Sequence, residues 1–130
     1  MTVSGFAKYF VLNGTPEKLA GFAAKLAYKK MASGDQKWMD YFVALDPAPY
    51  IARIHCPMLA LNGDKDSQVI PEFNLKKIEA LCPSADCRLY EGRNHLFQHC
   101  TTGLGTEYPG IEETISEDVI ADVVAWVAQR

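Results

Sequence analysis

The sequence has no apolar run that approaches the ~18 residues needed to cross a membrane. Its first residues, Met1 to Phe6, lack the basic flank and the long apolar stretch of a secretion signal. An excess of positive charge is also missing, because 13 Lys and Arg stand against 16 Asp and Glu, for a formal net charge of −3. This balance argues against a general nucleic-acid or anionic-membrane surface. We therefore expect a soluble globular protein with no nucleic-acid or membrane partner.

The four cysteines contain no C-x-x-C pair; they are Cys56, Cys82, Cys87 and Cys100. The sequence also lacks a secretion signal, and its hydrophobic content of 48% can supply a core without disulfides. We expect reduced thiols and a reducing, cytoplasmic compartment. Internal repeats and low-complexity linkers are missing as well, and 130 residues suit one domain.

The first 50 residues are expected to be helical. Thr15-Pro16-Glu17 is a helix start, with a hydroxyl for an unpaired N–H, proline at the first helical position and an acid near the positive dipole end. Leu19, Phe22 and Leu26 follow at helical spacing and predict a buried stripe that ends before residue 33.

A second short helix is predicted from Gln36 to Leu45. It offers four large apolar side chains for burial: Trp38, Met39, Phe42 and Val43. We interpret its aromatic residues as core rather than as a ligand platform. Asp46-Pro47-Ala48-Pro49 then breaks the helical pattern.

From residue 54 the pattern changes to alternating strands and helices. Pro57 to Leu61 is a short apolar run typical of a strand covered on both faces, and Cys87 to Tyr90 is the next strand candidate. A helix from Pro71 to Leu81 lies between them. Its expected buried face consists of Phe73, Leu75, Ile78 and Leu81. Strand, helix and strand together form a βαβ unit with parallel strands.

The last helix is predicted from about Ser116 to Ala128. Its apolar stripe consists of Val119, Ile120, Val123, Val124 and Val127. Thr114 and Glu117 have the spacing of a capping box at its start.

Two chemically capable side chains follow the two predicted strands. Asp66 lies in the polar loop after the first strand, and His95 lies in the loop after the second. Loops that leave the carboxyl ends of parallel strands meet at one edge of the sheet, where open α/β proteins bind their ligands. The topology therefore predicts that one acid and one imidazole lie close together.

The order of these segments resembles the C-terminal part of an α/β-hydrolase. Ile54 to Val69 is similar to that family's penultimate strand and acid loop, and Gly92 to Gln98 to its histidine loop. Ile111 to Arg130 is similar to its closing helix, and Asp46-Pro47 begins the matching region. The resemblance implies an α/β fold with a partial parallel sheet. Residues 1–50 would be a helical lid or cap, and residues 51–130 the C-terminal βαβα part.

The resemblance also implies roles for individual residues. In the G-x-x-D pattern Gly63 is the turn glycine, Asp66 the triad acid and Asp64 a solvated loop acid without a catalytic role. His95 would be the triad base, with Nδ1 bonded to Asp66 so that Nε2 takes a proton from a serine. Nucleophile, acid and histidine follow one another in this family, and the last two are here in that order.

The nucleophile of such a triad is missing. The serines are Ser4, Ser33, Ser67, Ser84 and Ser116, and neither a serine nor a cysteine sits at the centre of a G-x-[SC]-x-G motif. An H-G-G loop for oxyanion donors is also lacking. We expect a C-terminal fragment of a serine hydrolase acting on a small acyl (ester-type) substrate, inactive without the N-terminal half and needing no cofactor or metal.

Other interpretations of these residues remain open. Asp66 can be a turn aspartate that caps its own loop, and His95 an ordinary surface or core imidazole. If this stretch is helical, His95 and His99 lie on one face of it and, with Cys100 or Glu91, could bind a divalent metal. We favour the interpretation of His99 as an incidental polar residue.

A two-stranded sheet also leaves an open strand edge. We therefore expect a homo-oligomer, either a homodimer or a swapped assembly, that covers this edge. The alternative function is a stand-alone, non-catalytic interaction or dimerisation module. Ester, thioester, lactone and amide substrates all remain open, because specificity depends on residues outside these motifs.

Overall fold

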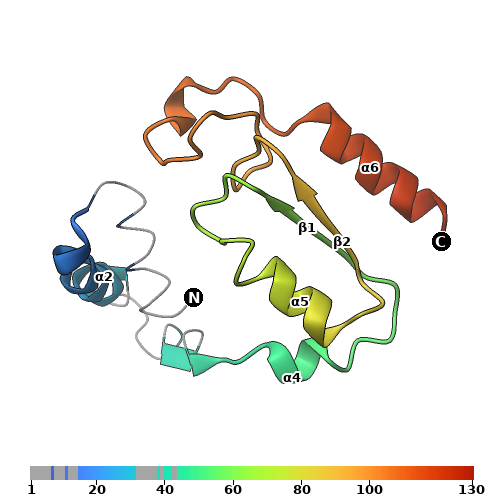
Figure 1. The fold of residues 1–130 in the computed structure, drawn as a ribbon, viewed down its shortest axis with the longest axis horizontal. Helices are drawn as coiled ribbons and strands as arrows, with labels where there is room; N and C mark the ends of the chain where they lie inside the picture. Colours follow the sequence, from blue (N-terminus) through green and yellow to red (C-terminus); the bar gives the residue numbers. More distant parts are fainter. Residues whose placement is uncertain (1–6, 8–10, 12–14, 32–37, 39, 42–43) are drawn as a thin grey trace. The chain divides into compact units, whose positions relative to one another are not determined.

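A computed structural model describes residues 7, 11, 15–31, 38, 40–41 and 44–130 of the chain. Its elements in chain order are α2 (Glu17–Met31), α4 (Ala48–Ile51), β1 (Leu59–Gly63), α5 (Leu75–Leu81), β2 (Asp86–Tyr90), the 3-10 helix η1 (Tyr108–Gly110) and α6 (Glu117–Ala128). The chain divides into two compact units, residues 1–47 and 48–130. The chain is mixed α/β, because its described elements are helices and, in the second unit, a small parallel sheet (Figure 1).

Helix α2 begins where the sequence predicts. The N–H groups of Leu19 and Ala20 both donate to the Pro16 carbonyl, at 2.8 and 3.1 Å. The predicted buried stripe is wrong, however, because the exposed fractions of its members are large: 56% for Leu19, 70% for Phe22 and 58% for Leu26. The buried residues of this helix are instead Ala20 and Ala24, which are 2% and 0% exposed.

Half of the predicted helix from 36 to 45 lies outside the described residues, including Met39, Phe42 and Val43. Of the described positions within it, 38, 40, 41 and 44 are helical and 45 is not. Trp38 is 56% exposed, so its predicted burial is wrong. The predicted break at 46–49 is confirmed only at Asp46 and Pro47, because Ala48 already begins α4.

The predicted βαβ unit is confirmed. Strands β1 and β2 pair in parallel, from Leu59 opposite Asp86 to Gly63 opposite Tyr90, and α5 connects them. β1 starts two residues later than the apolar run and continues through Asn62 and Gly63, which hydrogen bonding to β2 draws into the strand.

Helix α5 also starts later than predicted. Residues 71–74 form a turn in which the N–H groups of Phe73 and Asn74 both donate to the Ile70 carbonyl. Phe73, predicted to be buried, is 56% exposed because it belongs to this turn. Leu75 is the buried residue of the helix.

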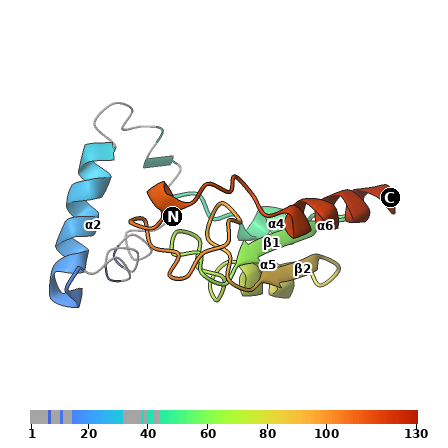
Figure 2. The same cartoon turned by 90° about the horizontal axis from the view of Figure 1, so that it is seen from above.

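The two longer helices of the second unit, α5 and α6, lie on opposite sides of the strands (Figure 1), and Figure 2 shows the same elements from above. On one face Tyr90 donates its hydroxyl to Asp122 of α6 at 2.8 Å, and Arg88 lies 3.5 Å from the same carboxylate. On the other face lies Cys87, whose thiol pKa is raised by burial and then by the charge of Glu79 on α5. The strand alternation thus assigns one side to each helix.

Helix α6 is confirmed, but its predicted capping box is wrong. The residue before its first turn is Ser116, which has extended φ and ψ angles of −68° and 139° and makes no side-chain cap. Its hydroxyl instead accepts a hydrogen bond from Arg93. Only Val119 of the predicted stripe is fully buried; Ile120, Val124 and Val127 are 43%, 61% and 60% exposed. A two-stranded sheet is too narrow to cover the whole apolar side of the helix.

All four cysteines are free thiols. Among the described residues, no helix is long and apolar enough to span a bilayer. The sheet of the described residues has two strands, and its assembly into an oligomer stays a prediction.

Replacing Val119 with alanine should destabilise the second unit by about 2 kcal/mol, since two buried methyl groups are lost and a cavity remains. The matched control is Val124→Ala in the same helix, where the side chain is 61% exposed and the change should stay within about 0.5 kcal/mol. Urea unfolding measures both. Equal losses for the two variants would contradict the burial described for α6.

Candidate active site

The loops that follow β1 and β2 bring the predicted acid and imidazole into contact. His95 Nδ1 lies 2.9 Å from Asp66 Oδ2. The Asp66 side chain is 5% exposed, whereas that of His95 is 37% exposed. The expectation that topology places these two residues side by side is therefore confirmed, and the pair joins a buried carboxylate to an accessible imidazole.

Four donors surround the Asp66 carboxylate. Oδ1 accepts the backbone N–H groups of Gln68 and Val69, at 2.9 and 2.8 Å. Oδ2 accepts the Asn62 amide at 3.2 Å and faces His95 Nδ1. A carboxylate offers about four acceptor positions, and all are used here. Asp66 therefore caps its own loop through one oxygen and binds the imidazole through the other.

This arrangement assigns the His95 tautomer. Because the Asp66 carboxylate is an acceptor toward its three other partners, His95 Nδ1 has to be the donor in the remaining contact and therefore carries the proton. An Nδ1 without a proton would place two acceptors against each other. The neutral imidazole then keeps its lone pair on Nε2. The ring can accept a proton on its far side while Asp66 stabilises the charge that develops.

Sequence reasoning missed Asn62. It is 5% exposed at the end of β1, and its amide nitrogen also donates to the Val69 carbonyl at 3.0 Å. Its one amide group thus joins the strand end, the loop and the carboxylate. A polar amide at the end of an otherwise apolar strand was the signal that could have identified it.

The two loops are held against each other by backbone contacts. Lys65 donates its N–H to the Arg93 carbonyl at 3.0 Å, and Gly92 donates its N–H to Asp64 Oδ1 at 2.7 Å. The prediction that Asp64 is a solvated loop acid is wrong, because its carboxylate ties the second loop to the first. Gly63 is required here, since a Cβ on it would collide with the Arg93 carbonyl.

The histidine loop is built around Asn94, which is fully buried. Its side-chain oxygen accepts the N–H groups of Leu96 and Gln98, at 2.9 and 3.1 Å. Its amide nitrogen donates to the Gln98 side chain at 2.9 Å. The loop closes with Phe97 at a φ of 56°, a conformation that non-glycine residues rarely adopt. This tight loop fixes the point from which His95 projects.

Arg93 joins this loop to α6. Its guanidinium donates to Ser116 Oγ at 2.9 Å and to Asp118 Oδ2 at 2.8 Å, while its side chain is nearly buried. The Ser116 hydroxyl, followed by the Val119 N–H and the charge of Arg93, lowers the pKa of Asp118. The acid of the first helical turn therefore stays ionised and holds the arginine.

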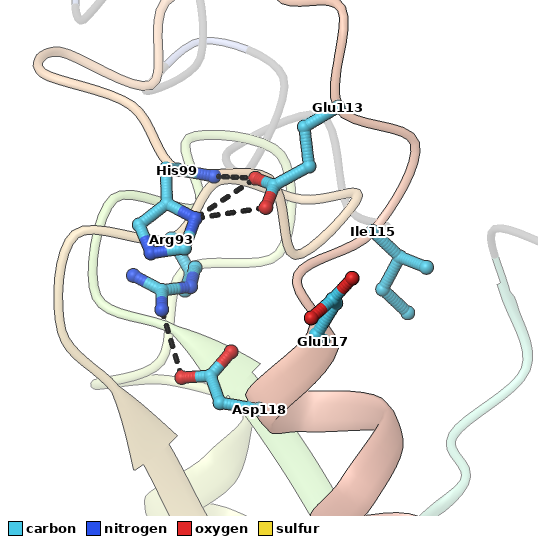
Figure 3. A pocket seen from close by; sticks show the side chains of 6 residues that line it. All are labelled: Arg93, His99, Glu113, Ile115, Glu117 and Asp118. Carbon is cyan, nitrogen blue, oxygen red and sulfur yellow. Dashed lines mark hydrogen bonds and ion pairs between the residues drawn. The ribbon is translucent and has the colours of Figure 1, made fainter.

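A shallow pocket of about 480 Å³ opens beside the ion pair of Arg93 and Asp118 (Figure 3). It is lined by Arg93, His99, Glu113, Ile115, Glu117 and Asp118. His99 Nδ1 lies 2.9 Å from both oxygens of Glu113, so the two side chains are hydrogen-bonded, and the interpretation of His99 as an incidental polar residue stays a prediction. Neither Asp66 nor His95 lines the pocket.

The groups of the alternative metal site have separate partners. His95 faces Asp66, His99 faces Glu113, and the Cys100 thiol donates to the Gly92 carbonyl at 3.6 Å. Burial raises the pKa of the Cys100 thiol, which opposes the thiolate that a metal needs. Within the described part of the chain no three metal-binding side chains converge.

The described serines are engaged elsewhere. Ser67 donates to the Gly103 carbonyl at 3.0 Å, Ser84 lies 3.5 Å from the Cys82 sulfur, and Ser116 accepts from Arg93. Ser4 and Ser33 lie outside the described residues. The described residues thus contribute an acid and a base but no serine bonded to that base.

A further loop, residues 100–110, was not assigned a role from the sequence. Its Glu107 carboxylate accepts the N–H groups of Thr101, Thr102 and Gly103 at 2.7 to 2.9 Å. The Thr102 hydroxyl donates to it as well, and these bonds lower the pKa of Glu107 to about 2. The ionised carboxylate organises the loop from within.

No protein-family model matches this chain, and no curated protein or solved structure is significantly similar to it.

Gly63→Ala should destabilise the protein by at least about 3 kcal/mol, because the new methyl group meets rigid backbone rather than a movable side chain. The matched control is Gly21→Ala in α2, where a Cβ has no neighbour within 4 Å. That change should be neutral or stabilise by about 0.5–1 kcal/mol. Denaturant unfolding checks both; a mild effect at Gly63 would contradict the close approach of the two loops.

Acid should release the loop held by Glu107. Because the folded pKa is lowered from 4.5 to about 2, the carboxylate's contribution is complete above pH 4.5 and is lost as the pH falls through 2. The amide proton shifts of Thr101, Thr102 and Gly103 should titrate together with a midpoint near 2. In Glu107→Gln this titration should disappear, and a wild-type midpoint near 4.5 would contradict the assigned contacts.

Proposed function

We propose that this chain is the C-terminal portion of an α/β-hydrolase-type serine hydrolase that acts on ester-type acyl bonds. Asp66 is its triad acid and His95 its triad base, while the nucleophile comes from an N-terminal half. The observation that carries the proposal is the 2.9 Å contact between His95 Nδ1 and Asp66 Oδ2. It lies at the carboxyl ends of two parallel strands, the edge at which open α/β folds place their sites.

The environment of the pair suits general acid–base catalysis. With Nδ1 committed to Asp66, Nε2 can take the proton of a serine hydroxyl as that oxygen attacks an acyl carbon. The imidazolium that forms lies against a carboxylate that is 5% exposed and fully hydrogen-bonded. Its proton then passes to the departing alkoxide or amine. Asp66 orients the ring and stabilises its charge without taking the proton itself.

The sequence around the pair supports the same function. Gly63 and Asp66 have the G-x-x-D spacing of the hydrolase acid loop, and the acid precedes the histidine along the chain. G-x-S-x-G and the oxyanion loop are missing, so we expect no turnover from this chain by itself. The N-terminal half is the required partner, and the substrate is a small acyl compound.

One observation favours the alternative of a non-catalytic interaction module. Apolar side chains on both α2 and α6 are more than 40% exposed: Leu19, Phe22, Leu26, Ile120, Val124 and Val127. Such faces are typical of surfaces that another polypeptide covers. The two functions differ in one observable property: only the hydrolase contains a serine whose reactivity requires His95.

The experiment is phosphonate labelling of the protein expressed from the complete reading frame that contains this chain. A fluorophosphonate reacts only with a serine that a neighbouring base activates. His95→Ala should lower the labelling rate by about four powers of ten, and Asp66→Asn should cause a similar loss by reversing the tautomer.

The matched control is His99→Ala, which removes a second imidazole, 62% exposed, from the same loop region. Its labelling rate should remain at the wild-type value. A wild-type protein without labelling, or one whose labelling survives His95→Ala, would overturn the hydrolase proposal and favour the interaction module.

A further inference from the structure

Tyr108 lies where the two loops of the candidate active site meet. Its hydroxyl oxygen accepts the backbone N–H of His95 at 3.2 Å and the side-chain amide of Gln68 at 3.4 Å. The backbone N–H of the same Gln68 donates to Asp66 Oδ1. The phenol oxygen of Tyr108 thus contacts the backbone of His95 directly. It also contacts Gln68, the residue whose N–H binds Asp66.

The segment that carries Tyr108 is anchored immediately before this contact. Glu107, the preceding residue, gathers three backbone N–H groups of residues 101–103. Ser67, the residue after the acid, donates to the Gly103 carbonyl at 3.0 Å. Gly103 itself has a φ of 68°, and a Cβ on it would collide with the Lys65 carbonyl. The loop of residues 100–110 is therefore fastened to the acid loop and cannot shift independently of it.

We propose that Tyr108 is a positioning residue that keeps His95 and Asp66 at hydrogen-bonding distance from each other. The imidazole is 37% exposed, so packing alone does not fix it. Its position follows from the backbone from which it projects and from the carboxylate it faces. Tyr108 fixes the backbone nitrogen of His95 directly and restrains the acid loop through Gln68.

The consequence of losing this hydroxyl follows from the geometry. Without it, the His95 N–H loses its acceptor and the Gln68 side chain its contact, while the backbone bonds to Asp66 remain. The His95–Asp66 hydrogen bond should then open more often. An error of about 1 Å in a catalytic group can cost about a hundredfold in rate. The role in catalysis rests on the proposed function, but the positioning of the pair is a property of this chain alone.

The first experiment uses the 130-residue chain labelled uniformly with ¹⁵N. In Tyr108→Phe the Nδ1 proton of His95 should exchange with solvent about tenfold faster, the effect of losing roughly one hydrogen bond. The Gly103 amide should keep its wild-type protection, because its bond to Glu107 does not involve the phenol. The matched control is Tyr50→Phe, a tyrosine that is 56% exposed on α4 and should change nothing.

Wild-type exchange at His95 in Tyr108→Phe would overturn the proposal. If the Gly103 amide also loses its protection in Tyr108→Phe, the variant has disturbed the whole loop, and Gln68→Met becomes the deciding test. This substitution removes only the side-chain contact to Tyr108 and keeps the backbone bond to Asp66. Faster His95 exchange in Gln68→Met supports the proposal, and wild-type exchange there overturns it.

A second experiment separates this inference from the proposed function. In the protein from the complete reading frame, Tyr108→Phe should reduce the phosphonate labelling rate about tenfold, and ester turnover should show a lower kcat with an unchanged KM. If the wild-type protein is never labelled, the hydrolase proposal fails while the exchange result still decides the role of Tyr108. If labelling depends on His95 but Tyr108→Phe leaves both readouts unchanged, only the positioning proposal fails.

Discussion

The buried carboxylate of Asp66 is the group on which the rest of the second unit depends. An ionised acid at 5% exposure is costly unless donors surround it, and its four donors come from three different segments. Asn62 belongs to the end of β1, Gln68 and Val69 to the loop of Asp66 itself, and His95 to the loop after β2. The charge is satisfied only when all three segments are in their places, so the site and the local fold form together.

Hydrogen bonds also connect the loops around Asp66 to helix α6. The loop after β2 can reach Asp66 because Gly63 leaves room for the Arg93 backbone and because Asp64 binds the Gly92 N–H. The Arg93 side chain continues in the other direction to Ser116 and Asp118. A continuous series of polar contacts therefore runs from the acid loop to the closing helix. It connects the position of His95 with the packing of α6 on the sheet.

Much of the architecture was predictable from local patterns. The parallel pair β1 and β2, the helix between them and α6 follow from short apolar runs and from helical spacing. The errors concern burial: Phe22 and Val124 lie on stripes of ideal spacing yet are exposed. Spacing defines an apolar side of a helix, but whether that side is covered depends on how wide the neighbouring layer is. The capping box at Thr114 failed because the helix begins at Glu117, so Ser116 rather than Thr114 is the residue that precedes its first turn.

The sequence by itself determined that Asp66 and His95 would meet, because the carboxyl ends of parallel strands share one edge of a sheet and the chain order assigns one residue to each loop. Only the tertiary structure decided what surrounds them. It placed the Asn62 amide beside the carboxylate and decided four further contacts: Asp64 with Gly92, Arg93 with Asp118, and Tyr108 with both His95 and Gln68. The partners in these four contacts lie 13 to 40 residues apart in the sequence. Polar residues of this kind look alike in a sequence, since spacing predicts which side of an element they occupy but not which distant partner they contact.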